Sequence, residues 1–266
     1  MNIKEIQQQY NVYTDFIRKV EKFFIHSLFK NPEALQYLYS RGMNDEYIKY
    51  FKLGFDPGFQ KTSEFLLFNK ISTDLLFKTK IADTHETGSY NITSNRVTFP
   101  LTDIAGNTVG FSCNVLPSYN KDKIYAKYIN TPTSYVFSKS LMLYNLYNAA
   151  RFIRNERYAI LVEGNFDVVT LFMYGLYNVV APCGTGFTQE HAYLLRYFTK
   201  KIILIYDGDA AGDKAYRRIL PIIAKADMIS YKVQLPSGED PDSYVKKYGK
   251  NILLKEIVGT FALETT

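Results

Sequence analysis

The second half of the sequence alternates short apolar runs with helical segments, and this alternation constrains the fold more than any other feature. The expected strands are 158–162, 178–181, 201–206 and 229–235, and the expected helices are 167–174, 188–198 and 211–224. Apolar strands separated by helices are typical of a mostly parallel sheet covered on both faces. In such sheets, ligands bind beyond the carboxyl ends of the strands.

Acidic residues stand where two of these strands end. Glu163 follows the apolar run that ends at Val162, and Asp207 and Asp209 flank Gly208 after another run. Because the ends of parallel strands meet at one edge, we expect the three carboxylates to converge. An Asp-Gly pair is also an ordinary turn signal, so neither segment identifies a site by itself.

Converging carboxylates need a cation. Two like charges about 4 Å apart repel by roughly 4 kcal/mol at an effective dielectric constant near 20. Carboxylate oxygens suit the hard ions Mg²⁺ and Mn²⁺, which also take phosphate oxygens as ligands. The pattern therefore predicts a site for one or both of these metals and, with it, phosphoryl-transfer chemistry.

A third acidic group follows the last expected strand and consists of Glu239, Asp240 and Asp242 around Pro241. These residues can support the same metals. The segment can equally cap the next helix, because Asp is a good N-cap and Pro is well tolerated at the first helical position. We expect both roles.

A Gly-rich turn precedes the expected helix capped by Thr188. Gly184, Thr185 and Gly186 place flexible backbone near a helix start, which can receive a phosphate. An ordinary tight turn between strand and helix explains the same residues equally well.

The first half of the sequence indicates a mixture of helices and strands. We expect a helix over 8–30, a second capped by Asn31 and a third capped by Asn44. Residues 96–101 and 108–115 flank a turn and predict a β-hairpin. The fold class is thus α/β, α+β overall. The expected domains are an amino-terminal α+β subdomain at 1–150, a metal-binding subdomain at 151–248 and a short helical tail at 249–266.

Charge and cysteine content narrow the function classes. The net charge of +6 and the pI of about 9.0 favour an anionic partner, although scattered surface lysines give the same balance. Cys113 and Cys183 are isolated, so we expect two buried thiols and neither a zinc site nor a disulfide. We find no signal peptide and no apolar run of membrane-spanning length, and therefore expect a cytoplasmic protein without a membrane partner.

Two segments of the second half resemble known signatures. Residues 162–167, VEGNFD, and 206–212, YDGDAAG, are similar to the two signatures of the Toprim fold. This fold occurs in primases, topoisomerases and some nucleases. The resemblance implies a metal site but leaves the reaction open.

The first half resembles the DnaG-type primases, because its motifs follow the order found in that family. These motifs are RVTFPL at 96–101, GF at 110–111, KYINTP at 127–132, FSK at 137–139 and LYNLY at 143–147. The resemblance covers about residues 10–250. It implies the catalytic core of a bacterial or phage primase.

The resemblance also implies roles for individual residues. Glu163, Asp207 and Asp209 would be catalytic and would bind two or more Mg²⁺ or Mn²⁺ ions, with Asp167, Asp240 and Asp242 in support. The residues implied to face nucleotide or template are Arg96, Lys127, Asn130 and Lys139, alongside Gly184 and Thr185. The implied partners are single-stranded DNA, NTPs and the RNA primer.

The sequence departs from the family at two places. Asn114 stands where the family often has a basic residue, and Ser140-Leu141 replaces a common Gly-Arg pair. We expect these changes to reduce affinity for template or nucleotide. The family's zinc module and helicase-contacting domain are not in this sequence, which suggests a phage-like or trimmed core that relies on a replicative helicase or a separate zinc-bearing protein.

The expected reaction is attack of a ribonucleotide 3′-hydroxyl on the α-phosphate of an incoming NTP, directed by the template. It would take place in a bacterial or phage-infected cell. Two alternatives remain open: a Toprim nuclease, and a non-catalytic DNA-binding accessory of replication or recombination.

Overall fold

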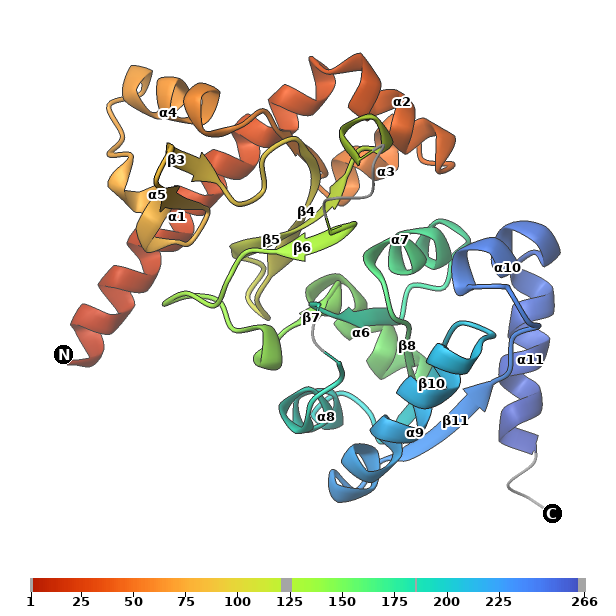
Figure 1. Cartoon of the computed structure of the whole chain (residues 1–266). Helices are drawn as coiled ribbons and strands as arrows, with labels where there is room; N and C mark the ends of the chain where they lie inside the picture. The colour runs from red at the N-terminus through yellow and green to blue at the C-terminus, as the bar shows by residue number, and fades with distance from the viewer. Residues whose placement is uncertain (1, 121–125, 185, 263–266) are drawn as a thin grey trace. The chain divides into compact units, whose positions relative to one another are not determined.

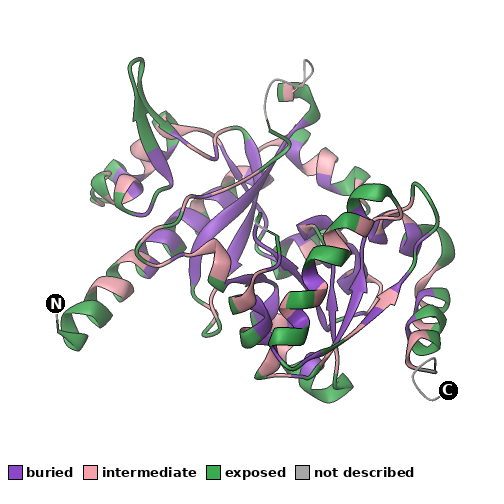
Figure 2. Cartoon of the chain, turned by 60° about the horizontal axis from the view of Figure 1, so that its bottom comes forward, coloured by how far each residue is buried: buried purple, intermediate pink, exposed green. Residues whose placement is uncertain are grey.

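The chain divides into two units, Met1–Lys139 and Ser140–Thr266. The computed structural model describes residues 2–120, 126–184 and 186–262 (Figure 1). Each unit contains its own buried core, shown in purple in Figure 2.

Capped helices open the first unit. Helix α1 spans Ile3–Phe29 and begins earlier than expected, because Asn2 and Glu5 form a capping box. The two expected short helices are confirmed as α2 (Pro32–Ser40) and α3 (Asp45–Tyr50). Their N-cap side chains, Asn31 and Asn44, each accept a backbone N–H at 3.0 Å.

An antiparallel sheet forms the centre of the first unit. Its strands run in the order β1 (Gly54–Asp56), β4 (Arg96–Thr102), β5 (Thr108–Val115) and β6 (Tyr128–Asn130). The expected hairpin is confirmed as β4 and β5. One face of the sheet packs against α1, where Phe16, Ile17, Val20 and Phe24 join Phe111 and Cys113 in a core cluster.

Shorter elements complete this unit. They are α4 (Phe59–Phe68), α5 (Asp74–Lys78), β2 (Ala82–His85), β3 (Gly88–Asn91) and the 3-10 helix η1 (Pro117–Asn120). Strands β2 and β3 pair with each other as a separate hairpin. The fully buried Asp56 joins these elements, because its carboxylate accepts hydrogen bonds from Gly58, Asn91 and Thr93.

The second unit has the expected mostly parallel sheet. Strands β8 (Ala159–Leu161), β9 (Val179–Pro182), β10 (Lys201–Ile205) and β11 (Ile229–Val233) are parallel, and the order is β11-β10-β8-β9-β7. Only β7 (Leu143–Tyr144) runs antiparallel within this described sheet. The four parallel strands are those that the apolar runs predicted.

Helices cover this sheet. Side chains of α6 (Leu146–Glu156), α8 (Gln189–Arg196) and α9 (Ala210–Lys225) share a core with alternate residues of β8, β9 and β10. The other helices are α7 (Asn165–Met173), α10 (Pro241–Tyr248) and α11 (Lys250–Ala262). Of these, α7 contacts β9 and α11 contacts β11.

The division between the units lies earlier in the chain than the boundary expected after residue 150. The 3-10 helix η2 (Lys139–Leu141) lies at the division. Residues 140–150 group with the second unit, because β7 pairs with β9 through Leu143 and Pro182 and through Tyr144 and Ala181. A two-residue edge strand followed by a helix leaves no apolar run long enough to assign it to a sheet from sequence.

Both cysteines are buried, as expected. Within the described residues, no helix combines the length and apolar composition needed to cross a bilayer.

Candidate active site

The carboxyl ends of β8 and β10 lie next to each other. Ala159 pairs with Ile202 and Leu161 with Leu204, so the two strands end in the same register. Glu163 leaves β8 and Asp207 leaves β10 at this shared edge. A hydrogen bond from the Asp207 backbone N–H reaches the Glu163 carboxylate.

Gly208 allows the third acidic segment to approach Asp207 and Asp209. A Cβ atom at this position would lie 2.0 Å from the Pro236 carbonyl oxygen, closer than any side chain tolerates. The Gly208 N–H donates to the Glu239 carbonyl at 2.9 Å. The loop after β11 is therefore held directly against the turn between the two aspartates, which only glycine permits.

The electrostatics show that these carboxylates are crowded. Burial, together with the negative charges of Asp240, Asp207 and Asp242, raises the pKa of Asp167 to about 8. Burial also raises the pKa of Glu163, together with the charges of Asp207 and Asp209. Acids from three strand ends thus repel one another at one edge of the sheet, which is the situation that a cation relieves.

Several of the acids also start helices. The Asp167 carboxylate accepts the Gly164 N–H at 3.0 Å at the start of α7. In the same way, Asp209 accepts the Gly212 N–H at 2.8 Å at the start of α9. The expected capping role of Asp240 is confirmed, because its side chain caps α10. Capping fixes one oxygen of each carboxylate and so fixes the direction of the other.

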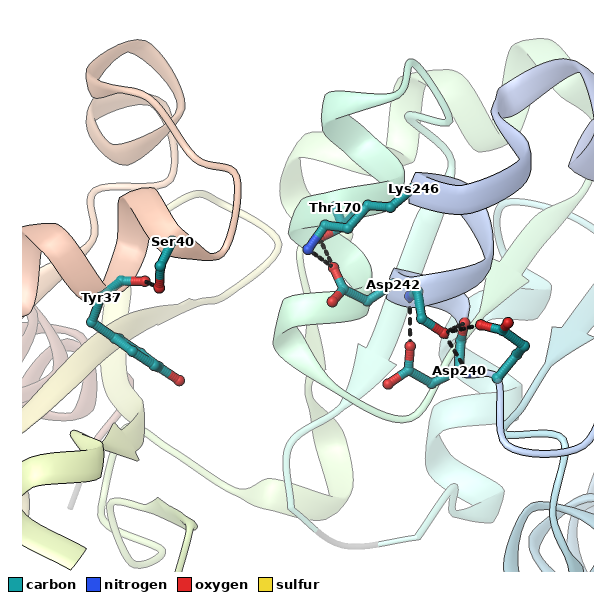
Figure 3. A network of polar contacts seen from close by, with 8 residues as sticks. Tyr37, Ser40, Thr170, Asp240, Asp242 and Lys246 are labelled. Carbon is teal, nitrogen blue, oxygen red and sulfur yellow. Dashed lines mark hydrogen bonds and ion pairs between the residues drawn. The ribbon is translucent and has the colours of Figure 1, made fainter.

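Asp242 is held by its neighbours within the second unit (Figure 3). The Thr170 hydroxyl donates to Asp242, and Lys246 forms an ion pair with the same oxygen at 2.7 Å. Lys247 forms a similar pair with Glu239 at 2.7 Å. Thr170, Lys246 and Lys247 were missed in the sequence, because a single polar residue on a helix gives no signal of its partner.

The donor set fits a hard divalent cation, since Glu163, Asp207 and Asp209 offer carboxylate oxygens at one edge. Across the described residues, no three His, Cys, Asp or Glu side chains are positioned to enclose a metal ion. The pKa values of Glu163 and Asp167 are raised by burial first and by the neighbouring carboxylates second, and bound Mg²⁺ or Mn²⁺ would offset the second contribution. The metal roles of these residues stay predictions.

A cavity of about 430 Å³ opens beside Glu163. Phe187 and Tyr206 contribute aromatic walls, and Arg218 of α9 contributes a positive charge. A cavity of this size can hold part of a nucleotide. Arg218 was not singled out from the sequence, where it is one of two adjacent arginines in an expected helix.

The residues predicted to face nucleotide or template in the first unit differ in their surroundings. Arg96 is buried and its Nη1 donates to the Ala126 carbonyl at 2.8 Å. Lys127 is exposed, with its Nζ 5.1 Å from the centre of the Tyr128 ring. Asn130 is half-buried in β6, and its Oδ1 has no hydrogen-bond partner among the described residues.

Lys139 and Gly184 complete the set that can be located. Lys139 is half-buried at the start of η2, and Gly184, two residues after the end of β9, has a φ of 72°. Thr185 lies outside the described residues. The expected Thr188 cap is present at the start of α8.

The two departures from the family pattern have different environments. Asn114 is buried, and its Nδ2 donates to the Tyr37 hydroxyl at 2.8 Å. Asn114 therefore forms a hydrogen bond within the first unit, to Tyr37, which lies with Ser40 on α2 (Figure 3). Leu141, by contrast, is 56% exposed.

Family models match both halves of the chain. Residues 23–150 match the model described as DNA primase catalytic core, N-terminal domain, and residues 160–245 match one described as Toprim-like. The DNA primase of Aquifex aeolicus is 38% identical over 258 residues, covering 97% of this chain and 51% of that protein. That of Rickettsia conorii is 37% identical over 259 residues, covering 96% and 42%. The chain spans about half the length of these curated relatives.

Solved structures agree over nearly the whole chain. The Aquifex aeolicus primase, with its zinc-binding and RNA polymerase domains, matches with a TM-score of 0.87 and 36% identity, covering 98% of this chain and 63% of that chain. A DnaG primase catalytic domain bound to single-stranded DNA matches with a TM-score of 0.80 and 32% identity, covering 96% and 82%. Since both halves match in order and most of a catalytic domain is covered, the chain belongs to the DnaG primase family, in which it corresponds to the catalytic core.

Proposed function

We propose that this chain is the catalytic core of a DNA primase and synthesises short RNA primers on single-stranded DNA. It would be a DNA-directed RNA polymerase that uses NTPs as substrates and Mg²⁺ or Mn²⁺ as cofactor. The observation that carries the proposal is the gathering of Glu163, Asp207 and Asp209 where β8 and β10 end, with Asp240 close enough to Asp167 to help raise the pKa of that buried carboxyl.

We assign the acids two roles. Glu163, Asp207 and Asp209 would hold the metals, which, when bound, would activate the primer 3′-hydroxyl and neutralise charge on the triphosphate. Asp167, Asp240 and Asp242 would support them, and each is fixed by a hydrogen bond at a helix start, as Asp209 also is. Their negative charge would keep the bound cations in place.

Cationic and polar groups would hold the other substrates. Arg218 in the cavity beside Glu163 is suited to a phosphate or base of the NTP. Lys127 and Lys139 of the first unit would contact the template backbone, and Gly184 would approach a phosphate through its N–H. The related catalytic domain bound to single-stranded DNA supports the choice of template.

The test is incorporation of labelled NTPs into RNA on single-stranded DNA, with Mg²⁺ or Mn²⁺. Asp207→Asn preserves the shape of the side chain and removes its charge, so we expect a loss of at least about a hundredfold in rate. A matched control is Asp213→Asn, which removes an acid of α9 whose partner is Lys232 rather than the carboxylate cluster. The control should stay close to wild type.

The other outcomes select other functions. Strand scission without NTPs would indicate a Toprim nuclease. DNA binding without metal-dependent turnover, falling steeply as salt rises, would indicate an accessory protein. Recovery of activity only when a replicative helicase or a zinc-bearing protein is added would identify these partners as required for template selection.

A further inference from the structure

The first unit contains a cavity that the proposed reaction does not use. It has a volume of about 380 Å³ and is lined by residues of α1, β1 and α4 and the segments next to them. All its lining residues belong to the first unit, whereas the carboxylate cluster lies in the second. The volume lies within the range of about 300–1,000 Å³ that is usual for small-molecule sites.

Aromatic rings form the apolar part of this cavity. Phe23 of α1 and Phe65 of α4 stack with their ring centres 4.4 Å apart and their planes 14° from parallel. Phe55 of β1 adds a buried third ring. Phe23 and Phe65 are each half-buried, so ring surface remains open to the cavity. Such a surface favours a flat apolar group.

Two lysines and a histidine line two walls of the cavity. His26 and Lys30 lie one helical turn apart on α1, and Lys61 lies in the first turn of α4. All three are exposed, and none forms a hydrogen bond or ion pair within the part of the chain that the structure describes. The charges of Lys30 and Lys61 are thus available to an anion.

Glu64 is the one acidic side chain among the lining residues, and its Oε1 accepts a hydrogen bond from Gln60 at 3.1 Å. A carboxylate in this place can accept from an amino or hydroxyl group. The cavity therefore combines an aromatic surface, a positively charged rim and one hydrogen-bond acceptor. The net charge of the rim remains positive.

We propose that this cavity is a second nucleotide site, which binds a nucleoside phosphate independently of the metal-dependent reaction. The base would lie against Phe23 and Phe65, the phosphate between Lys30 and Lys61, and Glu64 would accept from the ribose or an amino group. An acidic peptide would form ion pairs with the lysines but would leave the flat aromatic surface without a partner. The inference does not rest on the proposed polymerase activity.

The experiment is calorimetric titration of the whole chain with AMP in the presence of EDTA, which removes metal-dependent binding. Lys30→Gln combined with Lys61→Gln removes two charged contacts and should weaken AMP binding by at least about tenfold, since the loss of even one such contact has this effect. The matched control is Lys19→Gln combined with Lys78→Gln, two exposed lysines outside the cavity. Control and wild type should bind equally. Photo-crosslinking with 8-azido-AMP should label peptides of α1 and α4.

Three results would overturn the proposal. The first is equal AMP affinity in wild type and the Lys30/Lys61 variant, or no binding by either. The second is binding of inorganic phosphate or of adenosine as tight as that of AMP. The third is displacement of AMP by poly-glutamate at equal concentration, which would point to a protein partner. Loss of RNA synthesis by Asp207→Asn with AMP binding retained leaves this inference standing.

Discussion

Replacing Gly212 by Ala tests whether the start of α9 is built around Asp207. A Cβ atom at Gly212 would lie 2.1 Å from the Asp207 carbonyl oxygen and 3.0 Å from its carbonyl carbon. Both atoms belong to the backbone, so neither can rotate away. The first turn of α9 would have to move by about 1 Å, and overpacking of this kind costs about 1–3 kcal/mol or more.

The helical gain from the added methyl group opposes this cost. Ala is favoured over Gly inside a helix by about 1 kcal/mol. Movement of the turn would also loosen the 2.8 Å cap from the Gly212 N–H to Asp209, and a lost cap costs about 1 kcal/mol. We therefore expect Gly212→Ala to lower the free energy of unfolding by about 2 kcal/mol.

Gly259→Ala is the matched control, because Gly259 lies in α11 and no atom lies within 4 Å of its added Cβ. It should raise stability by up to about 1 kcal/mol. Urea unfolding of the two variants beside wild type measures both values. A shift of the same sign and size in the two variants would refute the steric argument. Gly212→Ala should also lose metal-dependent activity, since Asp207 and Asp209 would separate.

Two further predictions concern buried polar groups. Burial raises the pKa of Asp56, so the folded chain holds the carboxyl proton more tightly than the unfolded chain does. The protonated carboxyl therefore favours folding at low pH. This contribution is lost as pH rises through the raised pKa. Asp56→Asn should therefore gain stability relative to wild type as pH rises above about 4, the ordinary pKa of an Asp, and a difference in melting temperature that does not change with pH would contradict this. Thr170→Val removes the hydroxyl that donates to Asp242 and should cost about 1.5–3 kcal/mol, whereas Thr260→Val on α11 should cost much less. Equal losses in chemical unfolding would show that the bond to Asp242 contributes little.

The sequence by itself determined the parallel sheet and its acidic edge. Strands β8 to β11 are apolar runs of the right length. Glu163 and Asp207 follow the ends of β8 and β10 by two residues, and Asp240 lies in the loop after β11. The N-caps Asn31, Asn44 and Thr188 were equally readable, because capping depends on residues only three positions apart.

Tertiary structure alone decided which groups face one another. Nothing in the sequence joins Thr170 to Asp242, β7 to β9, or Phe23 to Phe65, because each pair is brought together by packing across a long stretch of chain. The close approach of Pro236 to Gly208 is likewise decided by the tertiary structure. Helix caps and strands are stabilised by residues that are close in sequence, so local patterns predict them. The distances between side chains far apart in sequence instead follow from how the helices pack over each sheet.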